Sequence, residues 1–295
     1  MTTTANGAPR FFSVVIPAHN AGDTLREQVD ALREQDSAAL MDVIVVDSMS
    51  TDDTVAVVER LRASWPKVRL VTATRSGANA ARNQGVEASA ADGVLMCDAD
   101  DVIGDTWISS LTSALHDNDV VRGRYSLDRL NGPDLVAARG PLPSDEQIAS
   151  APLMGGLGGC CAFRRTCWER LGGLNEAHYG ADDMEFFWRA QISGLRVAYV
   201  PAAVVHYRLR SDPRSLYVQQ RQWASSRALL FKEFGQLGAI RRRTLRAAVK
   251  SWGWTAVHAS DRWSEQPRVQ GRWVRVHAHN VGNLRGSLRH RVLYP

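Results

Sequence analysis

The sequence has few cysteines and no long hydrophobic run, and each shortage argues against a class of protein. Four cysteines occur among 295 residues, two of them are adjacent, and none forms a CxxC pair. This spacing suits neither a zinc site nor a disulfide framework, so a reducing cytoplasm is the expected compartment. No stretch approaches the roughly 20 consecutive apolar residues of a membrane span. The N-terminus also lacks the basic and apolar segments of a secretion signal.

Acidic residues are scarce at the C-terminal end. Residues 231–295 contain 13 Lys and Arg against 3 Asp and Glu, which leaves 23 basic and 28 acidic residues for the first 230. A mildly acidic body therefore carries a basic tail, and the two are expected to do different work. The sequence predicts a disordered N-terminus at 1–10, one large domain at 11–230 and a basic helical extension at 231–295.

Apolar runs alternate with helical patterns over the first 130 residues. Strands are predicted at 11–17, 41–47, 68–73 and 94–97, and helices at 22–35, 52–64 and 77–90. This alternation predicts an α/β fold with a mainly parallel central sheet flanked by helices. Further on, 131–159 is predicted to be a loop, 182–193 a helix and 197–205 a strand. The chain beyond Leu216 is predicted to be helical, with breaks near Gly235 and Pro267.

The acidic sequence DADD at 98–101 directly follows an apolar strand. Two carboxylates at positions i and i+2 beyond a strand can bind a hard divalent cation that also contacts phosphate oxygens, and Mg²⁺ and Mn²⁺ are the candidates. A solvated acidic turn is the alternative, because three neighbouring carboxylates repel one another unless water or a cation screens them. Asp98 and Asp100 are the candidate ligands.

Other polar residues stand where ligands bind parallel sheets, outside the carboxyl ends of the strands. Asp47 ends an apolar run and is either a nucleotide contact or a turn residue. Arg82 lies in the small-residue segment GANAARNQG, where it either pairs with a diphosphate or is merely exposed. His206 follows another apolar run and is either a metal or phosphate ligand or a structural histidine.

A second acidic segment, GADDMEFFW, begins at Gly180 and enters the helix predicted at 182–193. Carboxylates at a helix N-terminus are stabilised as anions, which suits a capping pair and equally suits a base that must stay ionised. Asp182 and Asp183 are the two candidates.

Together these segments resemble the inverting family 2 glycosyltransferases of the GT-A fold. The resemblance covers about residues 13–208, and its elements occur in the family's order. They are SVVIPAHNAGDTL at 13–25, VIVVDSMSTDDT at 43–54, GANAARNQG at 77–85, VLMCDADD at 94–101, RLGGLNEAHYGADDMEFFWRA at 170–190 and VAYVPAAVVHYR at 197–208.

The resemblance implies a role for each matching residue. Pro17, Ala18 and Asn20 would line the nucleotide pocket, Asp47 would contact the base and ribose, and Arg82 would meet the donor. Asp98 and Asp100 match the DxD pair, with Asp100 the more direct metal ligand. His206 matches a histidine beside the metal in some members. Asp183 matches the catalytic base, and Asp182 is the reserve choice because an aspartate stands there in place of the family's usual glutamate.

The implied protein is a metal-dependent enzyme that uses Mn²⁺ or Mg²⁺. It would move a sugar from a nucleotide-diphospho-sugar, with UDP or dTDP favoured by Asp47, to an acceptor hydroxyl in cell-surface polysaccharide or glycoconjugate synthesis. A nucleotidyltransferase would share the metal aspartates, but the Gly- and Arg-rich loop expected after its first strand is replaced here by PAHNAGDTL. A non-catalytic docking protein acting through the basic tail is the alternative from another class.

The basic tail permits several interpretations. Leu245, Val249 and Trp252 have helical spacing, and Leu284 and Leu288 belong to a second stripe. Amphipathic helices packing on the catalytic domain are the first interpretation. Peripheral contact with the inner face of an anionic membrane, which would suit a lipid-linked acceptor, is the second, and homo-oligomerisation is the third. No nucleic-acid-binding motif accompanies the charge, so no nucleic-acid partner is expected.

Overall fold

A computed structural model describes residues 7–139, 142–151, 153–178, 180, 182–240 and 242–294. The chain forms two compact units. Unit 1 comprises residues 1–126, 144–176 and 183–207, and unit 2 comprises 127–143, 177–182 and 208–295. The predicted boundary between the large domain and the basic extension, at residue 230, lies inside the helix Pro213–Phe234 of unit 2. The predicted disorder at 1–10 falls mostly outside the described residues.

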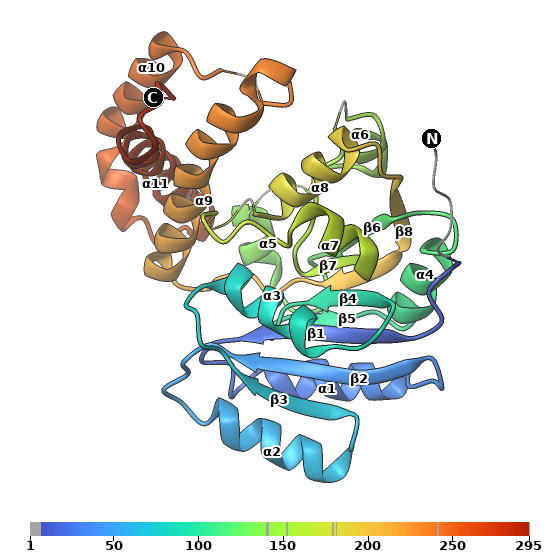
Figure 1. Ribbon diagram of the computed structural model, residues 1–295. Coiled ribbons are helices and arrows are strands. Elements are labelled where there is room, and N and C mark those ends of the chain that lie inside the picture. The colour runs from blue at the N-terminus through green and yellow to red at the C-terminus, as the bar shows by residue number, and fades with distance from the viewer. Residues whose placement is uncertain are drawn as a thin grey trace. The chain divides into compact units, whose positions relative to one another are not determined.

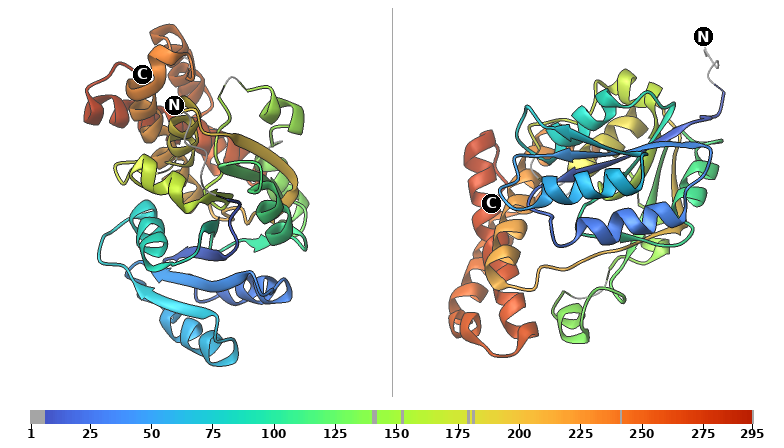
Figure 2. Two further views of the ribbon diagram at one scale, coloured as in Figure 1. Left: turned by 45° about the vertical axis from the view of Figure 1, so that its right-hand side comes forward. Right: turned by 90° about the horizontal axis from the view of Figure 1, so that it is seen from below.

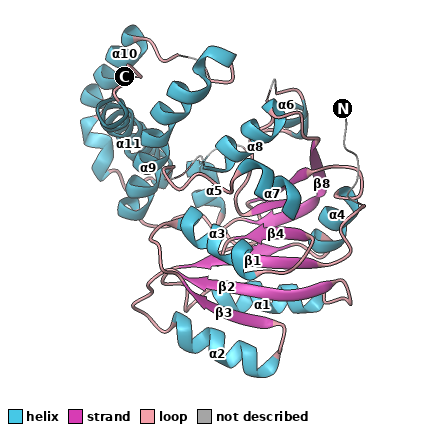
Figure 3. Cartoon of the chain, in the orientation of Figure 1, coloured by secondary structure: helices cyan, strands magenta, loops and turns pink. Residues whose placement is uncertain are grey.

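Unit 1 contains one mixed sheet whose strand order is β3-β2-β1-β4-β7-β6-β8-β5 (Figures 1 and 3). The strands are β1 (Phe12–Ala18), β2 (Leu40–Asp47), β3 (Val68–Thr72), β4 (Gly93–Cys97), β5 (Val102–Ile103), β6 (Val120–Ser126), β7 (Cys160–Arg164) and β8 (Val197–His206). Strands β1 to β4 are parallel, β7 runs antiparallel to both its neighbours, and β6 and β8 are parallel. The predicted α/β fold with a mainly parallel sheet is confirmed.

Helices cover both faces of this sheet because the apolar residues alternate along the strands. Val14 and Ile16 of β1 pack with α1 (Leu25–Glu34), α2 (Thr54–Ser64) and α4 (Trp107–Ala114). Val15 belongs to the opposite core, with α3 (Ala78–Ala88), α7 (Arg165–Leu171) and α8 (Asp182–Ile192). Figure 2 shows α1 and α2, in blue, side by side along one face.

Some elements differ from the sequence prediction. The segment 131–159 was expected to be a loop, but it contains the short helices α5 (Pro133–Arg139) and α6 (Asp145–Ala149). Ser144 and Gln147 form a reciprocal capping box at α6, which stabilises a helix too short to show an apolar period. Strand β6 was also missed, because its sequence VVRGRYS places two arginines among the apolar residues.

Unit 2 is helical, as the tail sequence predicted. Its long helices are α9 (Pro213–Phe234), α10 (Leu245–Val257) and α11 (Pro267–His290). Helix α11 packs closely on α9 at two glycines, since a Cβ on Gly282 or Gly286 would lie 2.4 Å from the Arg221 carbonyl oxygen or 2.3 Å from that of Ser225. Among the helices of the described residues, none combines the length and apolar character that crossing a bilayer requires.

The apolar stripes of the tail point outward rather than into a core. Leu245 and Val249 of α10 are 61% and 71% exposed, and Leu288 of α11 is 73% exposed. Leu245, Val249 and Leu288 therefore do not belong to the helical core of unit 2. Helix α11 instead buries mainly small and polar residues, namely Gly271, Val274, Ala278, Asn280, Gly282, Asn283 and Gly286.

Candidate active site

The carboxyl ends of β1, β2 and β4 meet at one edge of the sheet because these strands are parallel. Ala18 at the end of β1 pairs with Asp47 at the end of β2. Asp47 is 5% exposed, and its Oδ1 accepts a hydrogen bond from the Ser50 amide at 3.3 Å. Pro17 is half-buried and Ala18 is buried. Pro17, Ala18 and Asp47, which were predicted to contact the nucleotide, therefore lie at one edge of the sheet.

Asn20 connects the loops that follow β1 and β2. It has a positive φ of 51°, its amide donates to Ser50 Oγ at 2.9 Å, and its Oδ1 accepts from the Thr51 amide at 2.8 Å. Asp52 reinforces the same junction by accepting from the Gly22 amide at 3.0 Å. These hydrogen bonds give Asn20 a structural role in shaping this edge.

Asp98 and Arg82 form a short ion pair. Arg82 Nη2 lies 2.7 Å from Asp98 Oδ1, and the arginine is 7% exposed although it stands on the alanine-rich helix α3. The interpretation of Arg82 as an exposed surface residue is wrong, because α3 packs against β1 and β2 and turns this face inward.

Asp98, Arg82 and Asp183 all approach the adjacent glycines Gly158 and Gly159. The Gly158 amide donates to Asp183 Oδ2 at 3.2 Å, and a Cβ on Gly158 would lie 3.1 Å from Arg82 Nη2. A Cβ on Gly159 would lie 2.4 Å from Asp98 Oδ2. Side chains from α3, the end of β4 and the start of α8 therefore converge on these two glycines. At Gly159 a larger residue would displace the Asp98 carboxylate.

The DADD turn is held from α1. Gln28 Nε2 donates to the Asp98 carbonyl at 3.0 Å, Gln28 Oε1 accepts from the Ile103 amide at 2.9 Å, and Thr24 Oγ1 donates to the Ala99 carbonyl at 3.0 Å. Sequence reasoning missed Gln28, although a glutamine on the apolar face of an amphipathic helix was the available signal. The turn is fixed rather than freely solvated.

His206 is the last residue of β8 and pairs with Val102 of β5. Val102 follows Asp100 by two residues. Asp100 and His206 are both half-buried. Within the described residues, no three His, Cys, Asp or Glu side chains gather closely enough to hold a metal ion unaided. The register places His206 beside the DADD turn without completing a ligand cage.

Asp182, the reserve candidate for the base, begins helix α8, and its side chain lies outside the described part of the structure. Glu185, one turn later, is 3% exposed and pairs with Arg189 at 2.7 Å. Arg189 also donates to the Gly173 carbonyl at 2.8 Å. The Glu185 carboxylate is thus neutralised within its own helix.

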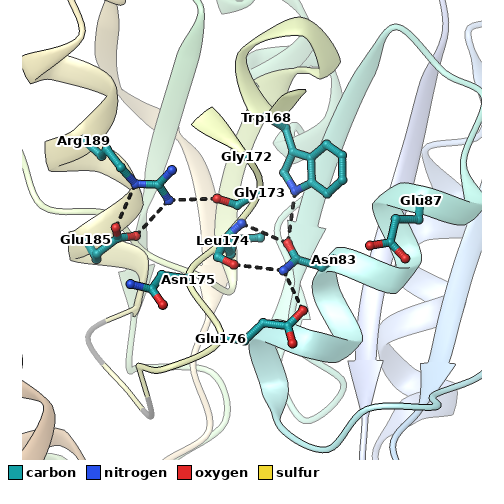
Figure 4. A pocket seen from close by; sticks show the side chains of 10 residues that line it. All are labelled: Asn83, Glu87, Trp168, Gly172, Gly173, Leu174, Asn175, Glu176, Glu185 and Arg189. Carbon is teal, nitrogen blue, oxygen red and sulfur yellow. Dashed lines mark hydrogen bonds and ion pairs between the residues drawn. The ribbon is translucent and has the colours of Figure 1, made fainter. Parts of the chain in front are cut away.

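A polar cavity of about 560 Å³ lies beside α3, α7 and α8 (Figure 4). Figure 4 shows the Asn83 amide at its centre, accepting from Trp168 Nε1 at 3.1 Å and donating to the Leu174 carbonyl at 2.9 Å and to Glu176 Oε1 at 3.0 Å. None of the site residues predicted from the sequence lines this cavity. Asn83 holds α3 to the segment before α8, so we interpret the cavity as structural.

Burial controls the ionisation of groups beside Asp98. Burial raises the pKa of Tyr125 well above its ordinary value, and the charges of Asp98 and Asp101 raise it further. A Cβ on Gly159 would lie 3.0 Å from the Tyr125 hydroxyl. Tyr125 therefore stays a neutral hydroxyl in this region at physiological pH.

Comparison with known proteins decides the family. The sequence model described as "Glycosyl transferase family 2" matches residues 13–172, and that described as "Glycosyl transferase family group 2" matches residues 146–264. The chain belongs to glycosyl transferase family 2. The sequence resemblance is confirmed, and the matched segment includes the strand ends, α3 and the DADD turn.

Curated relatives of this glycosyltransferase include an N-acetylglucosaminyltransferase of Bradyrhizobium diazoefficiens. It is 27% identical over 232 residues, covering 72% of this chain and 48% of the relative. The chain spans about a third to a half of the length of the first curated relatives it matches.

Solved structures share the fold. The mannosyltransferase PcManGT from Pyrobaculum calidifontis, in complex with GDP-Man and Mn²⁺, aligns with a TM-score of 0.65 at 21% identity, covering 94% of this chain and 87% of that one. TarS 1–349 of S. aureus, in complex with UDP-GlcNAc, aligns with a TM-score of 0.56 at 18% identity, covering 97% and 93%. The predicted GT-A fold is confirmed.

Proposed function

We propose that this family 2 glycosyltransferase transfers a sugar from a nucleotide-diphospho-sugar to an acceptor hydroxyl with inversion at the anomeric carbon. The acceptor oxygen would form a bond to the anomeric carbon while the bond between that carbon and the diphosphate oxygen breaks. Asp183 would take the hydroxyl proton, and the nucleoside diphosphate would leave. The observation that carries this proposal is the convergence of Asp98, Arg82 and Asp183 on the glycines at 158–159.

Asp47 is proposed to bind the nucleotide base. Its Oδ1 accepts a hydrogen bond from the Ser50 amide, so Oδ2 is the oxygen proposed to accept an N–H from the base. Uracil and thymine present such an N–H, which supports UDP or dTDP donors. Guanine presents one as well, so a donor screen must include GDP-mannose.

Mn²⁺ or Mg²⁺ is proposed to bind at the DADD turn. Asp98 and Asp100 are half-buried on the same turn, and their carboxylates supply the oxygen ligands that these hard cations prefer. Asp98 and Asp100 would hold the ion, with His206 nearby, and donor phosphates would complete its ligands. When bound, the cation would stabilise charge on the departing diphosphate. Arg82 would add a fixed positive charge on the same side.

Helix α10 is proposed to contact an anionic membrane, where a lipid-linked acceptor in cell-surface polysaccharide or glycoconjugate synthesis would be found. Leu245, Val249 and Trp252 form an exposed stripe, beside which Arg246 and Lys250 are also exposed. Helix α10 contains no acidic residue. Apolar side chains flanked by cations suit an anionic headgroup layer. A second copy fits less well, because two basic faces would repel each other.

A donor screen tests the proposed function without requiring the acceptor. The protein would be melted with UDP-, dTDP- and GDP-sugars, each with Mn²⁺, Mg²⁺ or EDTA. The expected result is a rise in Tm for one nucleotide class only when a divalent cation is present, followed by metal-dependent release of that nucleoside diphosphate. Stabilisation without release would favour a docking protein, and release of pyrophosphate from a nucleoside triphosphate would favour a nucleotidyltransferase.

A further inference from the structure

Arg122 is a buried cation in the middle of the sheet that the sequence analysis did not single out. It lies on β6 between Cys161 of β7 and Tyr199 of β8, and it is 8% exposed. Its guanidinium carbon lies 5.8 Å from the centroid of the Tyr199 ring. Burying a cation is costly unless its donors are used and an anion is near, so such an arginine requires a structural or functional reason.

The guanidinium fixes the main chain at the start of the glycine segment. Arg122 Nη1 donates to the Gly155 carbonyl at 2.7 Å, and Nε donates to the Gly123 carbonyl at 3.1 Å. A planar guanidinium that binds two carbonyl oxygens constrains direction as well as distance. Residue 155 is therefore held against strand β6.

The rest of this segment rests on Asp183. A Cβ on Gly156 would lie 2.4 Å from the Asp183 carbonyl oxygen, so the two backbones touch. The Gly158 amide then donates to Asp183 Oδ2 at 3.2 Å, while Asp183 Oδ1 accepts from the Met184 amide at 2.8 Å. One end of a short segment is thus fixed by Arg122, and the other end orients the carboxylate.

Charge links the same two residues. Burial lowers the pKa of Arg122, and the charge of Asp183 is the largest influence opposing that shift. The electrostatic interaction is mutual, so the cation favours the ionised form of Asp183. The other groups of this neighbourhood are Cys161 of β7, Arg82 of α3 and Asp98 after β4, and the last two already form an ion pair with each other.

We propose that Arg122 is a positioning residue for the transfer step, which holds segment 155–159 so that the Gly158 amide aims the Asp183 carboxylate at the acceptor hydroxyl. This inference rests on the proposed function, in which Asp183 is the base. Arg122 acts through the segment and through its charge, and it takes no proton itself.

The test compares Arg122→Met and Arg122→Lys with the wild type, using the donor found in the screen. We expect Arg122→Met to lower kcat about 100-fold, the scale on which a misplaced base acts, with the donor KM changed less than about twofold. The acid limb of its profile of kcat/KM against pH should move to higher pH. Arg122→Lys should return that limb toward the wild-type position while recovering only part of kcat.

Arg164 of β7 provides a matched control. It too is 8% exposed, and its Nη2 donates to the Leu115 and His116 carbonyls at 2.9 Å each, at the opposite end of β7 from the glycine segment. Arg164→Met should lower Tm and leave the pH profile unchanged. If Arg122→Met behaves in the same way, Arg122 is only structural and the inference fails.

Two further outcomes separate this inference from the proposed function. If Asp183→Asn keeps near-normal turnover, the base is misassigned and the proposed function fails at that residue. If Asp183→Asn is inactive while both Arg122 variants keep the wild-type pH profile, only the role of Arg122 is wrong. Should Arg122→Met fail to fold, a wild-type kcat and pH profile in Arg122→Lys would overturn the positioning role, because lysine cannot reproduce the two-carbonyl contact.

Discussion

The two units place polar and apolar groups in opposite ways. Unit 1 buries ionised side chains at its sheet, where Arg82 pairs with Asp98 and Arg122 binds two carbonyls. Unit 2 buries many small and amide side chains between its helices, beside large apolar ones such as Leu230, and exposes Leu245, Val249 and other large apolar residues. A buried charge network suits a reaction centre, and an outward apolar surface suits a partner phase. The difference is the basis of the proposed division between chemistry in unit 1 and membrane attachment through unit 2.

A polar network takes the place of a large apolar core between α10 and α11. Asn280 is 1% exposed, and its Oδ1 accepts from Arg243 Nη2 and Ser251 Oγ, each at 2.8 Å. Its Nδ2 donates to Thr255 Oγ1 at 3.2 Å. Buried amides that use both ends of the side chain specify one packing arrangement, so leucine is not needed there.

The largest expected effect concerns the base of unit 1. Asp183→Asn removes the proton acceptor while nearly preserving shape, so kcat should fall about 1,000-fold or more. Nucleoside diphosphate release from the donor found in the screen measures this loss. Asp105→Asn, an exposed change in the same unit, is the control and should keep turnover within about twofold. Vesicle binding by Asp183→Asn should equal that of the wild type, and a parallel loss would contradict the proposed division.

The next effect contrasts one glycine from each unit. In Gly159→Ala the new Cβ would lie 2.4 Å from Asp98 Oδ2, so the carboxylate must move. Donor affinity, measured by calorimetry with Mn²⁺, should fall at least about tenfold, and overpacking should cost about 1–3 kcal/mol of stability.

Gly253→Ala is the matched substitution. A Cβ there meets nothing within 4 Å, and the residue lies inside α10. Alanine should stabilise the helix by about 0.5–1 kcal/mol and leave donor affinity unchanged. Equal donor binding by the two alanine variants would show that Gly159 is not part of the site.

A smaller effect tests attachment through unit 2. In the double variant Leu245→Ser and Val249→Ser, binding to vesicles containing anionic lipid should weaken about tenfold or more, because two exposed apolar groups no longer insert. Flotation with neutral and anionic vesicles at low and high salt measures this. Ile192→Ser, at a 50% exposed position of unit 1, is the control. If the wild type binds neutral vesicles as tightly as anionic ones, or forms a dimer that the double variant abolishes, the partner of this surface is not an anionic membrane.

The smallest expected effect is a loss of stability of unit 2 at acidic pH. Burial, helped by nearby arginines, lowers the pKa of His279 to about 4, and its Nε2 lies 2.9 Å from Gln220 Oε1. The unfolded chain takes up a proton near the ordinary histidine pKa of about 6.5, whereas the folded chain does not. Unit 2 should therefore lose stability as the pH falls from about 6.5 to about 4.

His279→Gln removes that titration and should flatten the dependence of Tm on pH between 7 and 4.5. His116→Gln, a histidine in unit 1 that follows α4, is the control and should leave the slope unchanged. An unchanged slope in His279→Gln would show that other groups cause the acid sensitivity.

The sequence alone determined the alternating core and the elements around it. The strands at the apolar runs and the helices between them follow from local periodicity. The order of the sequence segments, the acidic ones included, predicted the family. The sequence could not predict that Arg82 is buried, that Asp98 and Asp183 both approach the glycines at 158–159, or that α11 turns leucine outward. Those features depend on which strands become neighbours and which helix face meets a partner.

Only the tertiary structure therefore decided the burial and contacts of Arg122. Within its strand it is one of two arginines in VVRGRYS, a sequence that resembles an edge strand or a turn. Pairing with β7 and β8 places it inside the sheet, where its donors meet carbonyls from residues 123 and 155. Local sequence fixes what each segment prefers to become, whereas contacts between segments far apart in the chain are settled by packing and by the need to satisfy every buried charge.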